Sequence, residues 1–326
     1  DGFWKSDSDM NLHSKQLVLG IDGGGSTTRA ALAVVTETCD FHVAGRGTAG
    51  ASNFNSCGWQ VATRQVQRAI QSAFESAGTE PHAVAAICLG MSGAGRSAEQ
   101  QAWLRWAEES GIAEQVTVVT DAETVLAAGT PDGTGVALIA GTGSLAFGKN
   151  AAVESARAGG WGYLLGDEGS GYQIALAALK GIARAVDGRG PETSLQAAFL
   201  KALALNDPRA LIGYLYHPER ERSEIASLSR LVFAAAAQGD VVALDILQQA
   251  VLELTELVQS VVTQLSFSSG EYGLALTGGI LLHQRGFRVS LLECLQEQEL
   301  EPTAIECVED ASLGAVRLAI KGLQKA

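Results

Sequence analysis

Short apolar runs alternate with stretches of helical periodicity over the first part of the chain. In residues 57–77, apolar side chains recur at three- and four-residue steps and Gly78 follows, which predicts a helix that ends there. The strands expected in this part are 16–21, 30–35, 84–89 and 115–120, and a second helix is expected at 98–110. Because strands that alternate with helices tend to pair in parallel, this pattern predicts an α/β fold with helices on the faces of a sheet.

The same order of elements begins again near Gly135. Residues 136–140 and 145–148 form a second pair of predicted strands around a glycine turn, as 16–21 and 30–35 do. The rest of the chain is largely helical, with helices expected at 171–186, 194–203, 224–238 and 240–265. A last strand is predicted at 274–276. This repetition predicts two related halves.

The composition narrows the classes of partner. The chain has 326 residues, 47% of them apolar, which suits about two domains with buried cores. Its 36 acidic and 23 basic side chains give a net charge of −13, which repels nucleic acid and anionic membrane surfaces. No apolar run approaches the length that spans a bilayer. We therefore expect no nucleic acid and no membrane among its partners.

The cysteines and the first residues indicate a reducing compartment. The five cysteines are odd in number, scattered and nowhere in a C-x-x-C pair, so structural zinc and an iron–sulfur cluster lack support. Residues 1–15 are polar and lack the apolar core of a signal peptide, and we treat them as an N-terminal extension. A cytoplasmic protein fits both features.

Glycine is in surplus, with 38 residues against about 23 at ordinary usage, and it gathers where predicted strands end. Turn 1 (residues 24–27) and turn 2 (residues 141–144) combine glycine with hydroxyl side chains, and turn 3 (residues 277–279) presents nearly bare backbone. Backbone N–H groups in such turns can surround an anion, so two of them suit the phosphates of a nucleoside triphosphate. Turn 3 suits a purine or ribose, and a plain hairpin is the alternative for turn 1 alone.

Two familiar nucleotide motifs do not occur at these turns. There is no lysine-bearing P-loop and no G-x-G-x-x-G after the first strand, which disfavours a nicotinamide enzyme. Phosphate charge would then be neutralised by backbone dipoles and a metal ion. Asp22, directly before the glycines, is the carboxylate that can hold magnesium through water.

Asp121, Asn53 and one glycine-rich segment are the remaining candidates for chemistry. Asp121 stands at the end of a predicted strand, where a carboxylate can accept the proton of an attacking hydroxyl; an ordinary helix cap is the alternative. Residues 159–171 hold six glycines, two aromatics and two acids, a composition suited to a polyhydroxylated ligand with Trp161 as an apolar wall. Asn53 lies in a loop, and a simple turn residue is its alternative.

Together these segments resemble the N-acetylglucosamine kinase family, within the BadF/BadG/BcrA/BcrD-type ATPases of the actin, hexokinase and heat-shock-chaperone superfamily. The motifs occur in the family's order over residues 16–320. They are Asp22-Gly23-Gly24-Gly25-Ser26-Thr27, Thr120-Asp121-Ala122, Gly141-Thr142-Gly143-Ser144, Gly160-Trp161-Gly162, Gly166-Asp167-Glu168-Gly169-Ser170 and Thr277-Gly278-Gly279.

The resemblance implies a fold and a domain division. It implies two actin-like ATPase (ribonuclease H-like) domains, each a mixed sheet flanked by helices, with an active-site cleft between them. The N-terminal domain would span residues 16–130 and be completed by the C-terminal helix 310–326, and the C-terminal domain would span 131–309.

The resemblance also implies roles for individual residues. Asp121 would be the catalytic base toward the sugar 6-hydroxyl and a sugar contact, and the other sugar contacts would be Asn53, Gly160, Trp161, Gly162 and Asp167. The ATP-binding residues expected from the turns and the resemblance together are Gly24, Gly25, Ser26, Thr27, Thr142, Gly143, Ala226, Gly278 and Gly279. Asp22 would order Mg²⁺ through water.

The function implied is an ATP- and magnesium-dependent kinase that makes the 6-phosphate of N-acetylglucosamine. N-acetylmuramic acid and glucosamine are alternative acceptors, and an ATPase switch that acts on a partner protein is an alternative of another class. Activators of that class carry cysteines that hold an iron–sulfur cluster across a dimer, and the cysteines here do not match them. Family members are often dimers, so the resemblance allows a homodimer.

Overall fold

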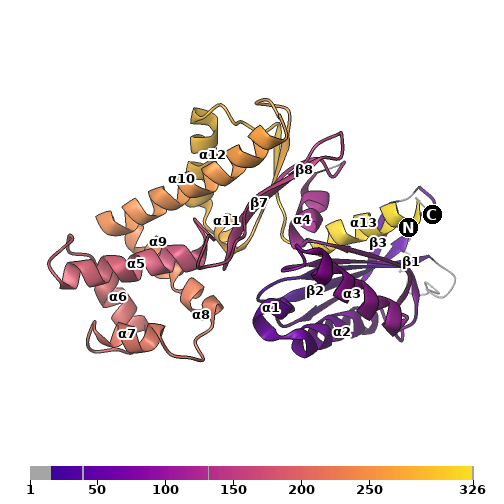
Figure 1. Ribbon diagram of the computed structural model, residues 1–326, viewed down its shortest axis with the longest axis horizontal. Helices are drawn as coiled ribbons and strands as arrows, with labels where there is room; N and C mark the ends of the chain where they lie inside the picture. Colours follow the sequence, from indigo (N-terminus) through magenta and orange to yellow (C-terminus); the bar gives the residue numbers. More distant parts are fainter. Residues whose placement is uncertain (1–15, 39, 131, 325–326) are drawn as a thin grey trace, which may run out of the picture. The chain divides into compact units, whose positions relative to one another are not determined.

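The computed structural model describes residues 16–38, 40–130 and 132–324, so the extension expected at 1–15 lies outside the described residues. The chain divides into two compact units. Unit 1 consists of the described residues up to Ala128 together with those from Asp310 onward, and unit 2 is Gly129–Glu309. Each unit is built on one five-stranded mixed sheet with helices beside it (Figure 1), which confirms the α/β class.

The sheet of unit 1 has the order β3-β2-β1-β4-β5. Its strands are β1 (Leu17–Gly23), β2 (Thr28–Val35), β3 (Phe41–Ala49), β4 (Val84–Met91) and β5 (Ala113–Val119). The pairs β1–β2 and β2–β3 are antiparallel, whereas β1–β4 and β4–β5 are parallel. The carboxyl ends of β1, β4 and β5 therefore lie at the same end of this sheet.

The two faces of this sheet are covered by different helices. Leu19 and Ile21 of β1 point into a core shared with α2 (Trp59–Ser76) and α3 (Ser97–Ser110). The intervening Val18 points into a second core, shared with α13 (Ser312–Leu323). This alternation follows from the two-residue period of a strand, because successive side chains point to opposite faces.

Unit 2 repeats the strand arrangement of unit 1. Its strands are β6 (Gly135–Ala140), β7 (Ser144–Lys149), β8 (Ser155–Gly159), β9 (Gly273–Thr277) and β10 (Ala304–Cys307), in the order β8-β7-β6-β9-β10. The pairs β6–β7 and β7–β8 are antiparallel, and β6–β9 and β9–β10 are parallel. The two related halves predicted from the sequence are thus confirmed by strand order.

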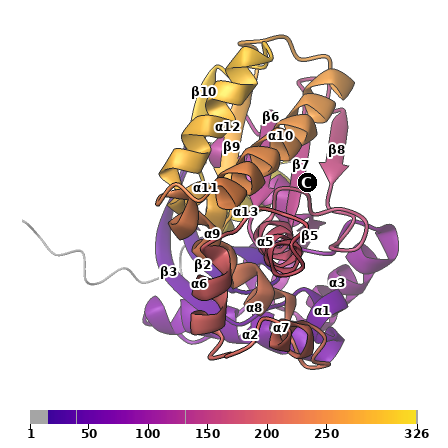
Figure 2. The ribbon, with the colours of Figure 1, turned by 90° about the vertical axis from the view of Figure 1, so that its left-hand side faces the viewer.

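The helices of unit 2 form one large core with its sheet. They are α5 (Gly171–Val186), α6 (Leu195–Ala202), α7 (Ala210–Leu215), α8 (Arg222–Ser227), α9 (Ser229–Ala236), α10 (Val241–Gln264), α11 (Gly279–His283) and α12 (Arg285–Glu297). The long α10 packs against α12 and α9 (Figure 2). Among the residues described, no single helix is long and apolar enough to cross a membrane; the bent pair 222–236 and 241–264 meets the length and composition criteria together.

The single helix expected at 224–238 is wrong, since the chain breaks there into α8 and α9. The hydroxyl of Ser227 donates to the Glu224 carbonyl at 2.6 Å, which is the acceptor that an α-helical bond from Leu228 would use. The Leu228 N–H instead bonds the Ile225 carbonyl at 3.0 Å. A serine that competes for a backbone acceptor in this way interrupts a helix.

Close packing of α13 on α4 (Asp121–Gly129) depends on Gly314. A Cβ atom at this position would collide with the Thr124 carbonyl oxygen. We expect Gly314→Ala to destabilise the protein by about 3 kcal/mol, because two backbones would have to separate. Gly322→Ala is the matched control on the same helix, since its Cβ would find no atom closer than 3.5 Å. Thermal denaturation measures both, and equal melting temperatures for the two variants would contradict the prediction.

Candidate active site

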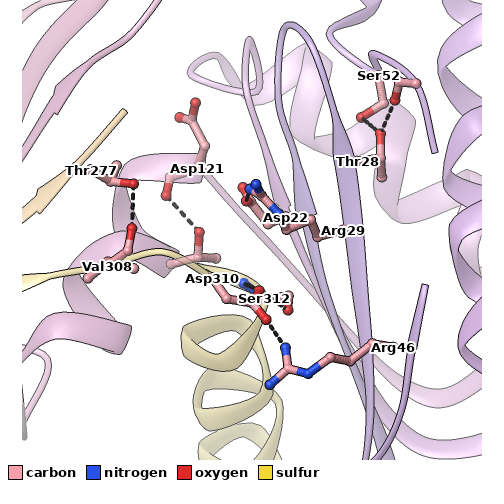
Figure 3. A network of polar contacts seen from close by, with 12 residues as sticks. Asp22, Thr28, Arg29, Arg46, Ser52, Asp121, Thr277, Val308, Asp310 and Ser312 are labelled. Atoms are coloured by element: carbon pink, nitrogen blue, oxygen red, sulfur yellow. Dashed lines mark hydrogen bonds and ion pairs between the residues drawn. The ribbon is translucent and has the colours of Figure 1, made fainter. Parts of the chain in front are cut away.

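Two carboxylates and an arginine gather at the end of β1 in unit 1. Asp22 is the penultimate residue of β1, and Asp121 is the first residue of α4, directly after β5 and Thr120. Burial, and then the negative charge of Asp121, raise the pKa of Asp22 to about 7, while Arg29 on β2 opposes the shift. The Arg29 guanidinium lies 3.7 Å from the Asp22 carboxylate (Figure 3). The end of β1 is therefore a place where negative charge is poorly solvated.

The capping box at the start of α4 is formed by Thr120 and Glu123. The Thr120 hydroxyl accepts from the Glu123 N–H at 3.4 Å, and the Glu123 carboxylate accepts from the Thr120 N–H at 2.9 Å, which is a reciprocal capping box. The Asp121 carboxylate accepts from the neighbouring Ala122 N–H at 3.0 Å. Thr120 and Glu123 therefore form the capping box of α4, while Asp121 stands one residue inside the helix and bonds a first-turn N–H.

Turn 1 joins β1 to β2 and lies beside Asp22. The Gly24 N–H bonds the Thr27 carbonyl at 2.9 Å and closes the turn, while Gly25 and Ser26 at its tip are exposed. The Gly24 carbonyl accepts from the Ser52 N–H at 3.1 Å, which places the loop before Asn53 against this turn. Unit 1 thus brings together turn 1, Asp22, Asp121 and the Asn53 loop.

Turn 2 and the glycine-rich segment meet in unit 2. The Ser144 N–H donates to the Asp167 carboxylate at 3.3 Å, and the Ser144 hydroxyl donates to the Glu168 carbonyl at 2.6 Å. The Gly160 N–H bonds the Ser144 carbonyl at 3.0 Å, and the Gly171 N–H bonds the Gly141 carbonyl at 2.8 Å. Turn 2 and the glycine-rich segment, which are separated in sequence by the strands β7 and β8, are therefore joined by hydrogen bonds.

Asp167 and Trp161 occupy opposite environments in the glycine-rich segment. Asp167 is 6% exposed and has a positive φ of 62°. Burial raises its pKa, and the Ser144 N–H and the charges of Arg222 and Arg157 act against that rise. Trp161 is 75% exposed, next to Gly160, whose carbonyl accepts from the Arg157 guanidinium at 2.9 Å. A buried acceptor near a free aromatic face suits a sugar, which has both hydroxyls and apolar C–H faces.

Turn 3 and Ala226 complete the cluster in unit 2. Gly278, with φ of 96°, lies so close to the Ala140 carbonyl and the Gly141 N–H that a side chain there would collide with them. Buried Ala226, on α8, has its carbonyl near the Cα of Gly171. The predicted site residues thus form one cluster in each unit, and the cleft expected between the domains stays a prediction.

Two residues near the candidate site of unit 1 were not predicted from the sequence. Arg29 is the cross-strand partner of Asp22, and the spacing of the two residues around the turn 1 hairpin was the signal that could have revealed the pair. Ser92, which follows β4, accepts a hydrogen bond from Asn53 at 3.3 Å, and nothing in its local sequence points to that role.

The donor chemistry at the end of β1 fits magnesium. Mg²⁺ prefers oxygen ligands and often uses one or two carboxylates together with waters and substrate phosphates. Asp22 supplies a carboxylate whose charge burial disfavours, so a nearby cation would stabilise it. No group of three or more His, Cys, Asp or Glu residues suited to holding a metal ion occurs within the described parts of the chain.

These two repeated sheets, with glycine turns at their strand ends, define an actin-like fold of the hexokinase type. A Schistosoma mansoni hexokinase complexed with glucose superimposes with a TM-score of 0.57 at 12% identity, over 94% of this chain and 84% of that one. A candidate N-acetylglucosamine kinase from Chromobacterium violaceum superimposes with a TM-score of 0.75 at 25% identity, over 94% and 99% of the two chains.

The chain belongs to the BadF/BadG/BcrA/BcrD ATPase family, whose model matches residues 19–319. It is 35% identical over 302 residues to the N-acetylmuramic acid/N-acetylglucosamine kinase of Clostridium acetobutylicum, covering 93% of this chain and 97% of the relative. It is 33% identical over 319 residues to the N-acetyl-D-glucosamine kinase of Dictyostelium discoideum, covering 94% and 98%. The family resemblance noted in the sequence is confirmed, and ATP use comes with this family.

Proposed function

We propose that this protein is an ATP-dependent kinase that phosphorylates the 6-hydroxyl of N-acetylglucosamine. The observation that carries the proposal is the pair of carboxylates, Asp22 and Asp121, beside a glycine turn in a chain related over almost its whole length to amino-sugar kinases. A base and a cation-binding acid beside a phosphate-sized turn are what phosphoryl transfer to a hydroxyl requires.

In the proposed reaction Asp121 accepts the proton of the sugar 6-hydroxyl. As the proton leaves, the hydroxyl oxygen forms a bond to the γ-phosphorus of ATP, and the bond from that phosphorus to the β-phosphate oxygen breaks to release ADP. The position of Asp121 at the first residue of α4 fixes its backbone, because the Thr120–Glu123 capping box holds the start of the helix. We assign Asp121 the roles of general base and sugar contact.

The residues proposed to bind ATP are those of the three glycine turns together with Ala226, each taken within its own unit. Gly24, Gly25, Ser26 and Thr27 in unit 1, with Thr142 and Gly143 in unit 2, would donate to the phosphates, and Ala226, Gly278 and Gly279 would lie along the nucleoside. Mg²⁺ held by Asp22 through water would neutralise phosphate charge during the transfer. Arg29 adds a cation, and because its side chain is 45% exposed, its guanidinium can turn from Asp22 toward a phosphate.

The residues proposed to contact the sugar, besides Asp121, are Asn53 in unit 1 and Gly160, Trp161, Gly162 and Asp167 in unit 2. Asp167 offers a buried carboxylate acceptor for a ring hydroxyl, and Trp161 offers an exposed aromatic face. The name of the Clostridium relative supports N-acetylmuramic acid as a second acceptor to test. A cytoplasmic location and a homodimer stay predictions.

A coupled assay of ADP release tests the proposal. The panel is glucose, glucosamine, N-acetylglucosamine, N-acetylmannosamine and N-acetylmuramic acid, each with ATP and Mg²⁺. We expect ADP release to require a sugar and to be fastest per unit concentration with N-acetylglucosamine. Sugar-independent ATP hydrolysis would favour an ATPase switch, and no ADP above background with any sugar would refute the kinase assignment.

A further inference from the structure

Ser92 stands where the end of β4 meets both turn 1 and the Asn53 loop. Its backbone N–H donates to the Gly23 carbonyl, the last residue of β1, at 2.7 Å. Its hydroxyl oxygen accepts from the Asn53 side-chain amide at 3.3 Å. Because its main chain is tied to the neighbouring strand, the Ser92 hydroxyl presents a fixed acceptor to Asn53.

The second contact of Asn53 determines which way its amide faces. The Asn53 Oδ1 accepts from the Asn55 N–H at 3.1 Å and so caps α1 (Phe54–Cys57). A backbone N–H can only donate, so this end of the amide must be the oxygen and the other end the NH₂ group. The NH₂ group then needs an acceptor, which the Ser92 hydroxyl provides. With both ends assigned, one N–H and one oxygen lone pair of Asn53 remain for a ligand.

The loop that carries Asn53 is held in place by hydrogen bonds to buried hydroxyl groups. The Thr28 hydroxyl, at the start of β2, lies 2.7 Å from the Gly50 carbonyl and 2.8 Å from the Ser52 hydroxyl (Figure 3). Thr28 and Ser52 are both fully buried. The loop is therefore anchored to the same hairpin that forms turn 1.

Gly93 lies against a third side of the Asn53 side chain. Its φ of 87° is strained for other residues, and a Cβ there would lie 2.8 Å from the Asn53 Oδ1 and 2.7 Å from the Asn55 Nδ2. The Asn53 amide consequently rests against bare backbone and has little room to rotate. Contacts on three sides thus hold a side chain that is itself only half-buried.

We infer that Ser92 is a positioning residue for the amino sugar, holding the Asn53 amide so that its free N–H and lone pair meet adjacent ring hydroxyls. The inference rests on the proposed function, because it requires Asn53 to contact the sugar. It goes further in naming the hydroxyl that orients Asn53 and in joining the sugar contact to the end of β1. Ser92 acts through Asn53 and touches no reacting atom.

A double-mutant cycle on Ser92 and Asn53 tests this inference. We expect Ser92→Ala to lower kcat/KM for N-acetylglucosamine about fivefold at saturating ATP, the loss of one neutral hydrogen bond. The KM for ATP should change less than twofold. In an Asn53→Ala background, Ser92→Ala should have no further effect on kcat/KM, because its partner is absent. Ser110→Ala, which removes a hydroxyl bonded to the Ala107 carbonyl on α3, is the control and should match the wild type.

Three results would overturn the inference. An unchanged kcat/KM in Ser92→Ala would show that the hydroxyl does not position the sugar contact. The same fivefold loss in the Asn53→Ala background would show that Ser92 acts independently of Asn53. If the wild type itself phosphorylates no amino sugar, the proposed function fails first and the inference fails with it, a result that the wild-type assay distinguishes from the other two.

Discussion

Asp121→Asn is expected to lower kcat for sugar phosphorylation by about 10²- to 10⁴-fold, the usual contribution of a general base. Asparagine keeps the size of the side chain and can still accept from the Ala122 N–H, which the aspartate does at 3.0 Å. It cannot take a proton from the attacking hydroxyl. Steady-state ADP release, together with calorimetric titration of the sugar, should show turnover lost while sugar binding and the melting temperature are retained.

The control for Asp121 is Glu123→Gln, a neutralised carboxylate in the same turn of α4. Glu123 accepts from the Thr120 N–H and hydroxyl, and glutamine can replace it as an acceptor. Its kcat should stay within a fewfold of the wild type. Near-normal turnover in Asp121→Asn would remove Asp121 from the role of base, whatever the control does.

Asp22→Asn is expected to change stability and activity in opposite directions. The pKa of Asp22 is about 7 in the folded protein against an ordinary 3.8, so between these values the folded state binds more protons than the unfolded state. The stability of the metal-free wild type therefore falls as pH rises through this window. The stability of Asp22→Asn does not fall in this way, because asparagine does not ionise. The free energy of unfolding of the variant should exceed that of the wild type by up to about 4 kcal/mol above pH 7 and by little near pH 4. Its turnover with ATP and Mg²⁺ should fall by at least about 10²-fold, because the proposed metal anchor is lost.

Denaturant unfolding between pH 4 and 8 without metal or nucleotide measures the stability difference. Asp187→Asn is the control, since Asp187 forms an exposed ion pair with Arg189 at 2.7 Å in unit 2. Its stability relative to the wild type should not vary in this way with pH. Curves for Asp22→Asn and wild type that run parallel from pH 4 to 8 would mean that the Asp22 carboxylate is not destabilised by folding.

The central strands and long helices could be predicted because their apolar periodicity is strong. The helix expected at 57–77 is α2, Trp59–Ser76, and the strand expected at 84–89 lies within β4. The strands β3, β8 and β10, which lie at sheet edges, could not be predicted from the sequence. Their side chains are partly exposed, and β3 carries Gly45 and Gly47 where α2 packs closely, so neither strand propensity nor a buried face marks them.

The features of the candidate site that could be predicted are those formed by residues close together in the sequence. Glycine turns after strands and the position of Asp121 are visible in the chain itself. The raised pKa of Asp22, its partner Arg29, and the hydrogen bond from Asn53 to Ser92 arise from pairing between strands and loops distant in sequence. Such contacts depend on tertiary register, which local pattern does not determine.

The order in which the ribosome makes this chain has a consequence for unit 1. Unit 2 is continuous in sequence, whereas one core of unit 1 needs Val316 and Ile320 of α13 to cover Val18 and Cys88 of its sheet. That helix also bonds the end of α4, through Arg317 to the Ala127 and Ala128 carbonyls at 2.8 and 2.9 Å. During synthesis this apolar sheet face therefore stays uncovered until all of unit 2 has been made. The nascent protein thus carries a surface for chaperones or for aggregation that the finished protein does not have.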